Sequence, residues 1–269
     1  MIKDIIRKLR VKTLHCIANI RADSITDNSA DSNADSSTDS STDSNANSNV
    51  NSIKPGTSLL IIAPHPDDEV IGCAGLIQHS LDKGNDVYII ILTGGEASHN
   101  GCCEIPPQEL ITARRELAVN INRELGIPAA NLFLLDYPDG KINYSHYETD
   151  KLSRLIKNIR PDAIFIPHKG EGWSDHIQAG NIIKRMTEEM TDIRLYEYCV
   201  WFWYYNTWKI DWKNALLLNM TKEEHLRKKE AIDRYISPLA PCGKPWSGGL
   251  PKVFIEANYW KKELYFKIK

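Results

Sequence analysis

Residues 58–69 read Ser-Leu-Leu-Ile-Ile-Ala-Pro-His-Pro-Asp-Asp-Glu. The apolar run before the first proline predicts a buried strand, and the two prolines stop that strand from continuing. One imidazole and three carboxylates follow within five positions. Acids at the start of a helix can simply cap it, but capping explains one of them and leaves the histidine without a role. The stretch therefore predicts a strand that delivers a polar cluster to the end of a sheet.

The chain on either side of this cluster alternates apolar runs with helical patterns. The predicted strands cover 58–63, 87–92, 132–135, 163–166 and 195–200, and the predicted helices cover 70–81, 108–125, 147–159 and 175–190. Alternating buried strands and helices indicate an α/β fold, with a mostly parallel sheet and helices on both faces. Ligands bind such sheets beyond the carboxyl ends of the strands, so the polar residues there are the candidate site.

The polar cluster has the composition of a metal site. Neutral imidazole and carboxylate are ligands of zinc and similar divalent ions. His65 and Asp68 are three residues apart, so one turn can point both at the same ion. Asp67, between them, can stay off the metal and face a bound water molecule. A catalytic zinc has three protein ligands, so the third must come from another part of the chain.

A second polar loop follows the predicted strand at 163–166. It reads Pro-His-Lys-Gly-Glu-Gly-Trp-Ser-Asp-His over 167–176 and leads into a helix. His176 is the best candidate for the third ligand, and His168 is its competitor. Asp175 can orient the metal-binding loop, or it can only cap the helix that follows.

These motifs resemble those of the LmbE/PIG-L family of metal-dependent N-acetylglucosaminyl deacetylases. The resemblance spans roughly residues 56–240, and its most specific part is Pro-His-Pro-Asp-Asp-Glu at 64–69. Further matches are Leu-Thr-Gly-Gly-Glu at 92–96, Arg-Arg-Glu-Leu at 114–117 and Tyr-Pro-Asp-Gly at 137–140. The resemblance implies a Rossmann-like fold.

The same resemblance implies roles for individual residues. It implies a Zn²⁺ ion, or another divalent transition metal, bound by His65, Asp68 and His176, with Asp67 as the general base. The implied reaction is removal of the N-acetyl group from an N-acetylglucosamine-containing glycoconjugate, which releases acetate and an amino sugar. The substrate would be a small-molecule or lipid-linked amino sugar.

The resemblance also implies that Arg114 and Asp139 touch the hydroxyls of the sugar. The chain departs from the family pattern at Trp173, where the family commonly has a second histidine that helps to stabilise the oxyanion. His168, or Lys169 from the same loop, is a possible substitute for this helper. The loss of one oxyanion donor elsewhere costs about 10²–10³ in rate. Two alternatives therefore stay open: a non-catalytic sugar-binding relative, and a metal hydrolase that acts on another bond.

The first 52 residues differ from the rest of the chain in charge. Residues 1–22 carry a net charge of about +5, residues 23–52 about −6, and residues 53–269 are nearly neutral. Apolar residues at helical spacing make 1–22 a basic amphipathic segment, which could contact an anionic membrane, pack on the domain or form a partly ordered tail. Residues 23–52, rich in Asp, Ser and Asn, predict a disordered linker. The deacetylase-like catalytic domain is expected over 53–269.

The overall composition excludes several classes of protein. The 269 residues are 42% hydrophobic and carry a net charge of −2, which gives no support to a nucleic-acid binder. No apolar run reaches 18 residues and no secretory signal is evident, so we expect a cytoplasmic protein. Peripheral contact with a membrane through residues 1–22 stays an open alternative. The six cysteines include no CxxC pair, so we expect reduced thiols and no structural zinc knuckle.

Aromatic residues concentrate at 196–212. This stretch holds four of the seven tryptophans, which are Trp201, Trp203, Trp208 and Trp212. The stretch is either a core strand followed by a buried loop, or an aromatic wall for a sugar ring or a lipid-linked substrate.

Overall fold

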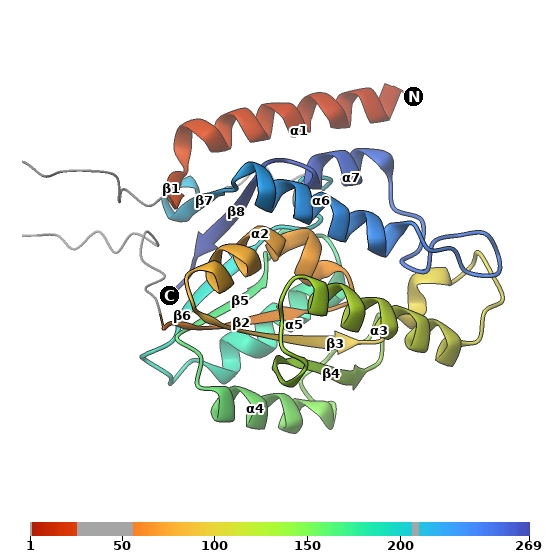
Figure 1. Ribbon diagram of the computed structural model, residues 1–269, viewed down its shortest axis with the longest axis horizontal. Coiled ribbons are helices and arrows are strands. Elements are labelled where there is room, and N and C mark those ends of the chain that lie inside the picture. Colours follow the sequence, from red (N-terminus) through yellow and green to blue (C-terminus); the bar gives the residue numbers. More distant parts are fainter. Residues whose placement is uncertain (1, 26–55, 206–209) are drawn as a thin grey trace, which may run out of the picture.

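The protein is built on one mostly parallel sheet with helices on both faces (Figure 1). The computed structural model describes residues 2–25, 56–205 and 210–269. Over these residues the strand order is β1-β7-β8-β6-β5-β2-β3-β4, and β8 alone runs antiparallel to its neighbours. The α/β class is therefore confirmed. The strands are β1 (Asp23–Ile25), β2 (Ser58–Ala63), β3 (Asp86–Thr93), β4 (Leu132–Tyr137), β5 (Ala163–Pro167), β6 (Arg194–Tyr198), β7 (Ala215–Asn219) and β8 (Lys262–Lys267).

Both faces of the central strand β2 are buried. Leu59 and Ile61 pack into one apolar cluster with α2, α3 and α6, whereas Leu60 and Ile62 pack into another with α4 and α5. Successive side chains of a strand point to opposite faces, so a continuous apolar run serves both clusters. The helices are α1 (Ile2–Arg21), α2 (Asp68–Asp82), α3 (Pro107–Glu124), α4 (Glu148–Ile159), α5 (Ser174–Met186), α6 (Lys222–Ile236) and α7 (Lys252–Asn258).

The basic N-terminal segment forms helix α1 and packs on the folded domain. Val11, Leu14 and Ala18 are buried against β7, β8 and α7. Packing on the domain, one of the three alternatives, is therefore the arrangement in the structure. A short strand, β1, follows and pairs with β7, although the sequence assigned Asp23–Ile25 to the linker. The remainder of the predicted linker and the boundary at residue 53 lie outside the described residues.

Every strand and helix predicted between residues 58 and 200 is present, with bounds that differ by a few residues. The largest difference is at α5, which ends at Met186 rather than at residue 190. Glu188 and Glu189 follow this end, and negative charge is unfavourable at a helix C-terminus. Four later elements, β7, α6, α7 and β8, were not predicted. In the described part of the chain, no helix has both the length and the hydrophobicity needed to cross a bilayer.

The parallel strands bring their carboxyl ends to one edge of the sheet. β2 pairs in parallel with both β3 and β5, and β3 pairs in parallel with β4. The segments that leave these strands therefore meet at the same edge, which is where ligands bind in open α/β sheets.

Candidate metal and catalytic site

The turn between β2 and α2 supplies the first part of the site. Asp67 precedes α2 and has a φ of 124°, a left-handed conformation that is costly for any residue except glycine. Its backbone N–H donates to Glu69 Oε2 at 3.1 Å, and Arg114 Nη2 donates to the carbonyl of Pro66 at 2.6 Å. These buried contacts hold the turn in its strained form, and such strain is typical of functional sites.

The three predicted metal ligands come together at this turn. One candidate ligand atom each from His65, Asp68 and His176 lies within 4.8 Å of the others. Asp68 Oδ2 lies 3.1 Å from His65 Nδ1 and 3.3 Å from His176 Nε2. Two imidazoles and one carboxylate are the donor set of many catalytic zinc sites, so these residues fit a divalent ion.

A glutamate that the sequence analysis left without a role lies behind His176. Glu171 is fully buried, and its Oε2 lies 3.5 Å from His176 Nδ1. Its carboxylate accepts from the backbone N–H groups of Val200, Trp201 and Phe202. A carboxylate behind a ligating histidine fixes the orientation of the ring. The acidic residue between two glycines of the 167–176 loop was the only sequence signal for this role.

Two further carboxylates surround His65. Asp139 Oδ1 lies 3.0 Å from His65 Nε2, and Asp175 Oδ2 lies 3.4 Å from the same atom. These three residues form a second group of possible ligands that shares His65 with the first. Asp175 also accepts from the backbone N–H groups of Gly140 and Ile142, so these contacts favour an orienting role over simple capping.

Asp67 is paired with Arg114 rather than with the histidines. Arg114 Nη2 lies 3.0 Å from Asp67 Oδ2, and its Nη1 donates to the carbonyl of Gly95 at 2.9 Å. Both side chains are buried and contribute to the lining of one cavity. Arg115 instead points to Asp136 and the carbonyl of Leu135, away from the site. The structure thus brings Arg114, and not Arg115, to the cluster.

Burial and charge pairing shift the pKa values in the cluster. Burial raises the pKa of Asp67 to about 7, against the lowering effect of Arg114. Burial also acts to raise the pKa of Asp68, but His176 and His65 hold it well below its usual range. Burial acts to lower the pKa of His176, but the neighbouring Asp68 carboxylate raises it, and the resulting pKa is about 9. The cluster therefore favours positive charge next to Asp68, which is what a divalent cation brings when it binds neutral imidazoles.

A cavity of about 380 Å³ opens above the cluster. Its walls include the segments that follow β2, β3, β4, β5 and β6 and the loop before α7. Trp173 and Trp201 form an aromatic side of this cavity, with ring centroids 5.5 Å apart. The lining residues include His65, Asp67, Asp68, Arg114, Asp139, Trp173, Asp175, His176 and Trp201.

The aromatic stretch at 196–212 is divided between the two predicted roles. Tyr198, Phe202 and Trp203 are buried in the core, whereas Trp201 reaches the cavity. Trp208 lies outside the described residues. The stretch is therefore mainly core, with one tryptophan at the site.

His168 does not come to the cavity. It is 3% exposed and packs against the rings of Phe202 and Phe266. Its Nδ1 accepts from the N–H of Gly170 at 2.9 Å, and Nε2 lies 3.5 Å from Glu197. Burial lowers the pKa of His168 to about 3, so the ring is neutral. The prediction of His168 as an oxyanion helper therefore finds no support, because the ring packs into the core and is absent from the described lining of the cavity.

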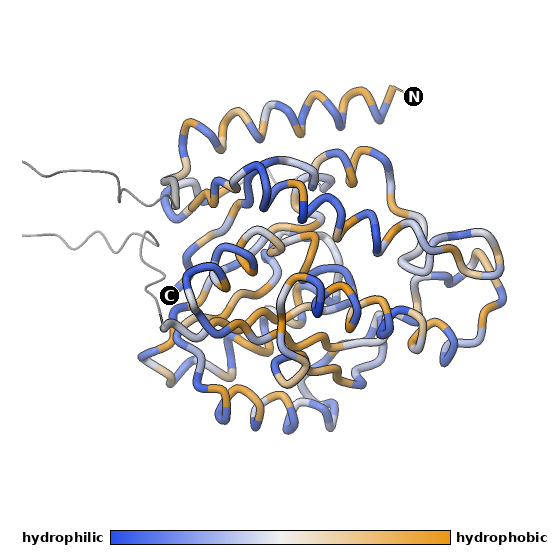
Figure 2. Tube along the Cα trace, viewed as in Figure 1, coloured by the Kyte–Doolittle hydropathy of each residue, from blue (hydrophilic) through white to orange (hydrophobic). Residues whose placement is uncertain are grey.

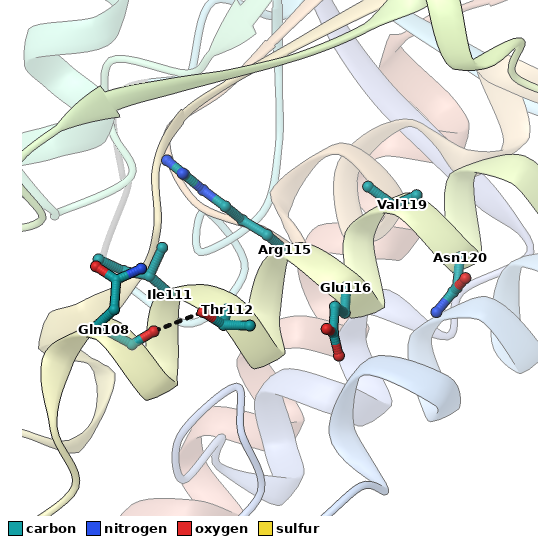
Figure 3. A pocket seen from close by; sticks show the side chains of 7 residues that line it. All are labelled: Gln108, Ile111, Thr112, Arg115, Glu116, Val119 and Asn120. Atoms are coloured by element: carbon teal, nitrogen blue, oxygen red, sulfur yellow. Dashed lines mark hydrogen bonds between the residues drawn. The ribbon is translucent and has the colours of Figure 1, made fainter.

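A separate hollow lies along the outer side of α3, lined by Gln108, Ile111, Thr112, Arg115, Glu116, Val119 and Asn120 (Figure 3). The Thr112 hydroxyl donates to the carbonyl of Gln108 within the helix at 2.8 Å. All the lining residues come from this one helix, and none of the candidate metal ligands is among them. The cavity at the strand ends is therefore the candidate site.

The fold is an α/β sheet that carries a candidate metal and catalytic cluster at its strand ends. Residues 60–187 form a PIG-L (LmbE-like) family domain, since they match the family described as GlcNAc-PI de-N-acetylase. The resemblance seen in the motifs is thereby confirmed.

Two curated relatives are similar to this chain over part of their length. A diacetylchitobiose deacetylase of Thermococcus kodakarensis is 31% identical over 125 residues, which cover 45% of this chain and 46% of the relative. A probable N-acetyl-alpha-D-glucosaminyl L-malate deacetylase 2 of Bacillus subtilis is 32% identical over 138 residues, which cover 47% and 59%. The chain thus spans about half the length of the curated relatives it matches.

The fold also matches solved structures. N,N'-diacetylchitobiose deacetylase from Pyrococcus horikoshii aligns with a TM-score of 0.53 and 23% identity, over 65% of this chain and 68% of that one. At this identity the match supports the fold alone.

Proposed function

We propose that this protein is a zinc-dependent hydrolase that removes the N-acetyl group from an N-acetylglucosamine-containing glycoconjugate. The observation that carries the proposal is the convergence of His65, Asp68 and His176 at the floor of the cavity, with Asp67 beside them. The family match and the names of the two curated relatives support a deacetylase.

His65, Asp68 and His176 would hold the ion, as their donor set fits zinc. A divalent ion there supplies Lewis acidity, which polarises an amide carbonyl and makes a water molecule more acidic. Glu171 and Asp175 keep the two imidazoles in orientation.

Asp67 is the proposed general base. Its carboxylate lines the cavity next to the ligands and is free of the two histidines, so it can accept a proton from the attacking water. It then returns this proton to the departing nitrogen, which leaves as the amine of the amino sugar. Arg114 orients the carboxylate through its ion pair and two backbone contacts.

The cavity is also the proposed sugar site. Asp139 and Arg114 are among its lining residues and are the proposed partners of the sugar hydroxyls. Trp173 and Trp201 offer ring faces to the apolar side of a pyranose. Trp173 occupies the place of the usual family histidine, so the pocket has gained stacking surface where it lacks an oxyanion donor.

Amine release from a panel of N-acetylglucosaminyl conjugates tests the function. The zinc-loaded protein should release a primary amine from at least one member, and Asp67→Asn should abolish release while one equivalent of metal stays bound at the site. A near-normal rate in Asp67→Asn contradicts the role of Asp67. Tight metal binding without release from any conjugate favours the sugar-binding alternative, and cleavage of an ester analogue alone favours another hydrolase.

We further propose that α1 carries the protein to the cytoplasmic surface of an anionic membrane. Ile2, Ile5, Ile6 and Leu9 are 54–73% exposed. At about 100° per residue they lie on the side of the helix opposite the buried stripe of Val11, Leu14 and Ala18. Figure 2 shows hydrophobic and hydrophilic residues alternating along α1. The free thiols of the described cysteines favour a reducing compartment. Flotation with phosphatidylserine vesicles should recover the protein, and the variant with Ile5→Ser and Leu9→Ser should stay behind. Equal flotation of both proteins contradicts the proposal.

A further inference from the structure

Three side chains that can bind a metal lie together outside the site described above. His99 ends the short helix η2 (Glu96–His99), Cys103 follows it, and Cys242 lies in the segment between α6 and α7. One candidate ligand atom of each lies within 4.8 Å of the others. These segments are far apart in sequence, and Figure 1 shows them side by side at the edge of the molecule.

The turn that carries Cys103 folds the thiol back towards His99. The backbone N–H groups of Cys102 and Cys103 both donate to the carbonyl of His99, at 3.0 and 3.4 Å. Gly101 has a φ of 77°, which allows the chain to reverse at this point.

A second glycine turn carries Cys242. Gly243 has a φ of 75°, and its N–H donates to the carbonyl of Ala240 at 2.8 Å. The N–H of Ala240 donates in turn to the carbonyl of Lys244 at 2.7 Å. Two tight turns therefore present one thiol each to the same point.

His99 shows an unused donor or acceptor at this point. The residue is 2% exposed, and its Nδ1 lies 3.0 Å from the hydroxyl of Ser98. Its Nε2 is buried and has no hydrogen-bond partner among the described residues. Buried polar atoms are nearly always paired, so an unpartnered nitrogen on an imidazole that lies near two thiols indicates a ligand.

We propose that His99, Cys103 and Cys242 bind a structural Zn²⁺ ion that is distinct from the ion of the candidate catalytic site. Two thiolates and one imidazole form a soft donor set that zinc prefers. Cys102 lies beside this donor set, with its Sγ 2.7 Å from that of Cys103, but it is not one of the three grouped ligands. Each ligating thiol releases one proton when the ion binds. The site has no CxxC spacing because its ligands come from two separate turns.

The ion would tie together two walls of the cavity. Ser98 and Asn100 line the cavity from the first segment, and Gly248 and Leu250 line it from the second. The segments already lie close, since a Cβ atom on Gly248 would fall 2.9 Å from the carbonyl oxygen of Ser98. The proposal does not depend on the deacetylase activity, because it concerns only what holds these walls together.

Titration of the reduced, metal-free full chain with Co²⁺ tests the site. Thiolate–cobalt bonds give a near-ultraviolet charge-transfer band, which the sulfur-free cluster of His65, Asp68 and His176 cannot produce. The wild-type protein should show this band and bind two equivalents of Co²⁺. The band should disappear when Zn²⁺ is added, because zinc binds the same site more tightly.

The variant with Cys103→Ser and Cys242→Ser should lose the band and one equivalent of metal. Cys16→Ser is the matched control, because Cys16 is an exposed thiol on α1. This variant should keep the charge-transfer band and bind two equivalents of Co²⁺. The wild-type measurement stands even if the double variant fails to fold. Absence of the band in the wild-type protein at saturating Co²⁺ overturns the proposal. So does peptide mapping that finds a Cys103–Cys242 disulfide in protein kept with excess Zn²⁺.

Discussion

At the scale of single residues, Gly95 shows how closely Arg114, the partner of the proposed base Asp67, is packed. Gly95 has a φ of 73°, and a Cβ atom there would lie 2.1 Å from Arg114 Nη1. Gly95→Ala should therefore displace the guanidinium and release Asp67 from its orientation. We expect kcat for amine release to fall by about 10²-fold, since small misplacements of a catalytic group have effects of this size.

Gly84→Ala is the matched control for this substitution. Gly84 has a φ of 74° but no heavy atom within 4 Å of the added Cβ. It shares the left-handed backbone cost of about 1–2 kcal/mol without touching the site. Equal loss of kcat in both variants would show that backbone strain, rather than the Arg114 contact, causes the effect.

Trp173 tests the sugar site at the same scale. Its ring is 45% exposed and stands edge-on to Trp201 in the cavity. Trp173→Ala should raise KM about 2–10-fold with little change in kcat, because an aromatic contact contributes roughly 0.5–1.5 kcal/mol to binding. Trp173→Phe should keep most of the affinity. A fall in kcat with unchanged KM in Trp173→Ala contradicts a stacking role and points to the reacting centre.

At the scale of elements, the docking of α1 should depend on pH through His15. The imidazole stacks on Trp260 with centroids 4.0 Å apart and meets Trp203 edge-on. Burial lowers the pKa of His15 to about 4. A released helix regains a pKa near 6.5 and takes up the proton first, so docking is complete above pH 6.5 and weakens as the pH falls towards 4. Hydrogen exchange of the α1 amides, corrected for intrinsic rates, should show reduced protection at pH 4.5 relative to pH 7.5.

His15→Phe provides the comparison for this pH effect. It keeps a ring between the two tryptophans but has no titrating group, so its α1 protection should not change between the two pH values. The same loss of protection in His15→Phe would assign the effect to other groups.

The elements also show where sequence patterns succeed and where they fail. β2, β3 and β5 were predicted because each is an apolar run with a proline or glycine soon after it. β8 was missed because its sequence, Lys-Glu-Leu-Tyr-Phe-Lys, has a carboxylate at a core position. Glu263 is buried there because it accepts from Lys228 Nζ at 2.7 Å and from the backbone N–H of Gly75 at 2.8 Å. Only the folded chain brings these partners together.

At the scale of the whole molecule, the site was predictable as far as its residues follow strand ends. His65 and Asp68 follow β2, and His176 lies in the first turn of α5 after the loop that leaves β5, so the parallel topology brings the three near one another. Glu171 was missed because its partners are backbone groups of a distant loop. The cluster of His99, Cys103 and Cys242 was missed because its residues come from two turns that are far apart in sequence, so no short motif marks it. The sequence therefore predicts residues that the strand ends bring together, but not residues that contacts between distant loops bring together.

Metal removal tests how far the whole fold depends on the candidate catalytic site. The sheet is held by apolar clusters, and the acids of the site are paired with histidines and Arg114, so chelation should stop turnover without unfolding the protein. The far-UV circular dichroism should stay unchanged, and Zn²⁺ should restore amine release.

An ion at 100 times its Kd adds about 2.7 kcal/mol to the free energy of unfolding, so chelation should lower Tm by about 5–10 °C. The variant with Cys103→Ser and Cys242→Ser confines the measurement to this site. Cooperative loss of the circular dichroism signal at room temperature on chelation contradicts this prediction, because it would make the ion part of the folding core.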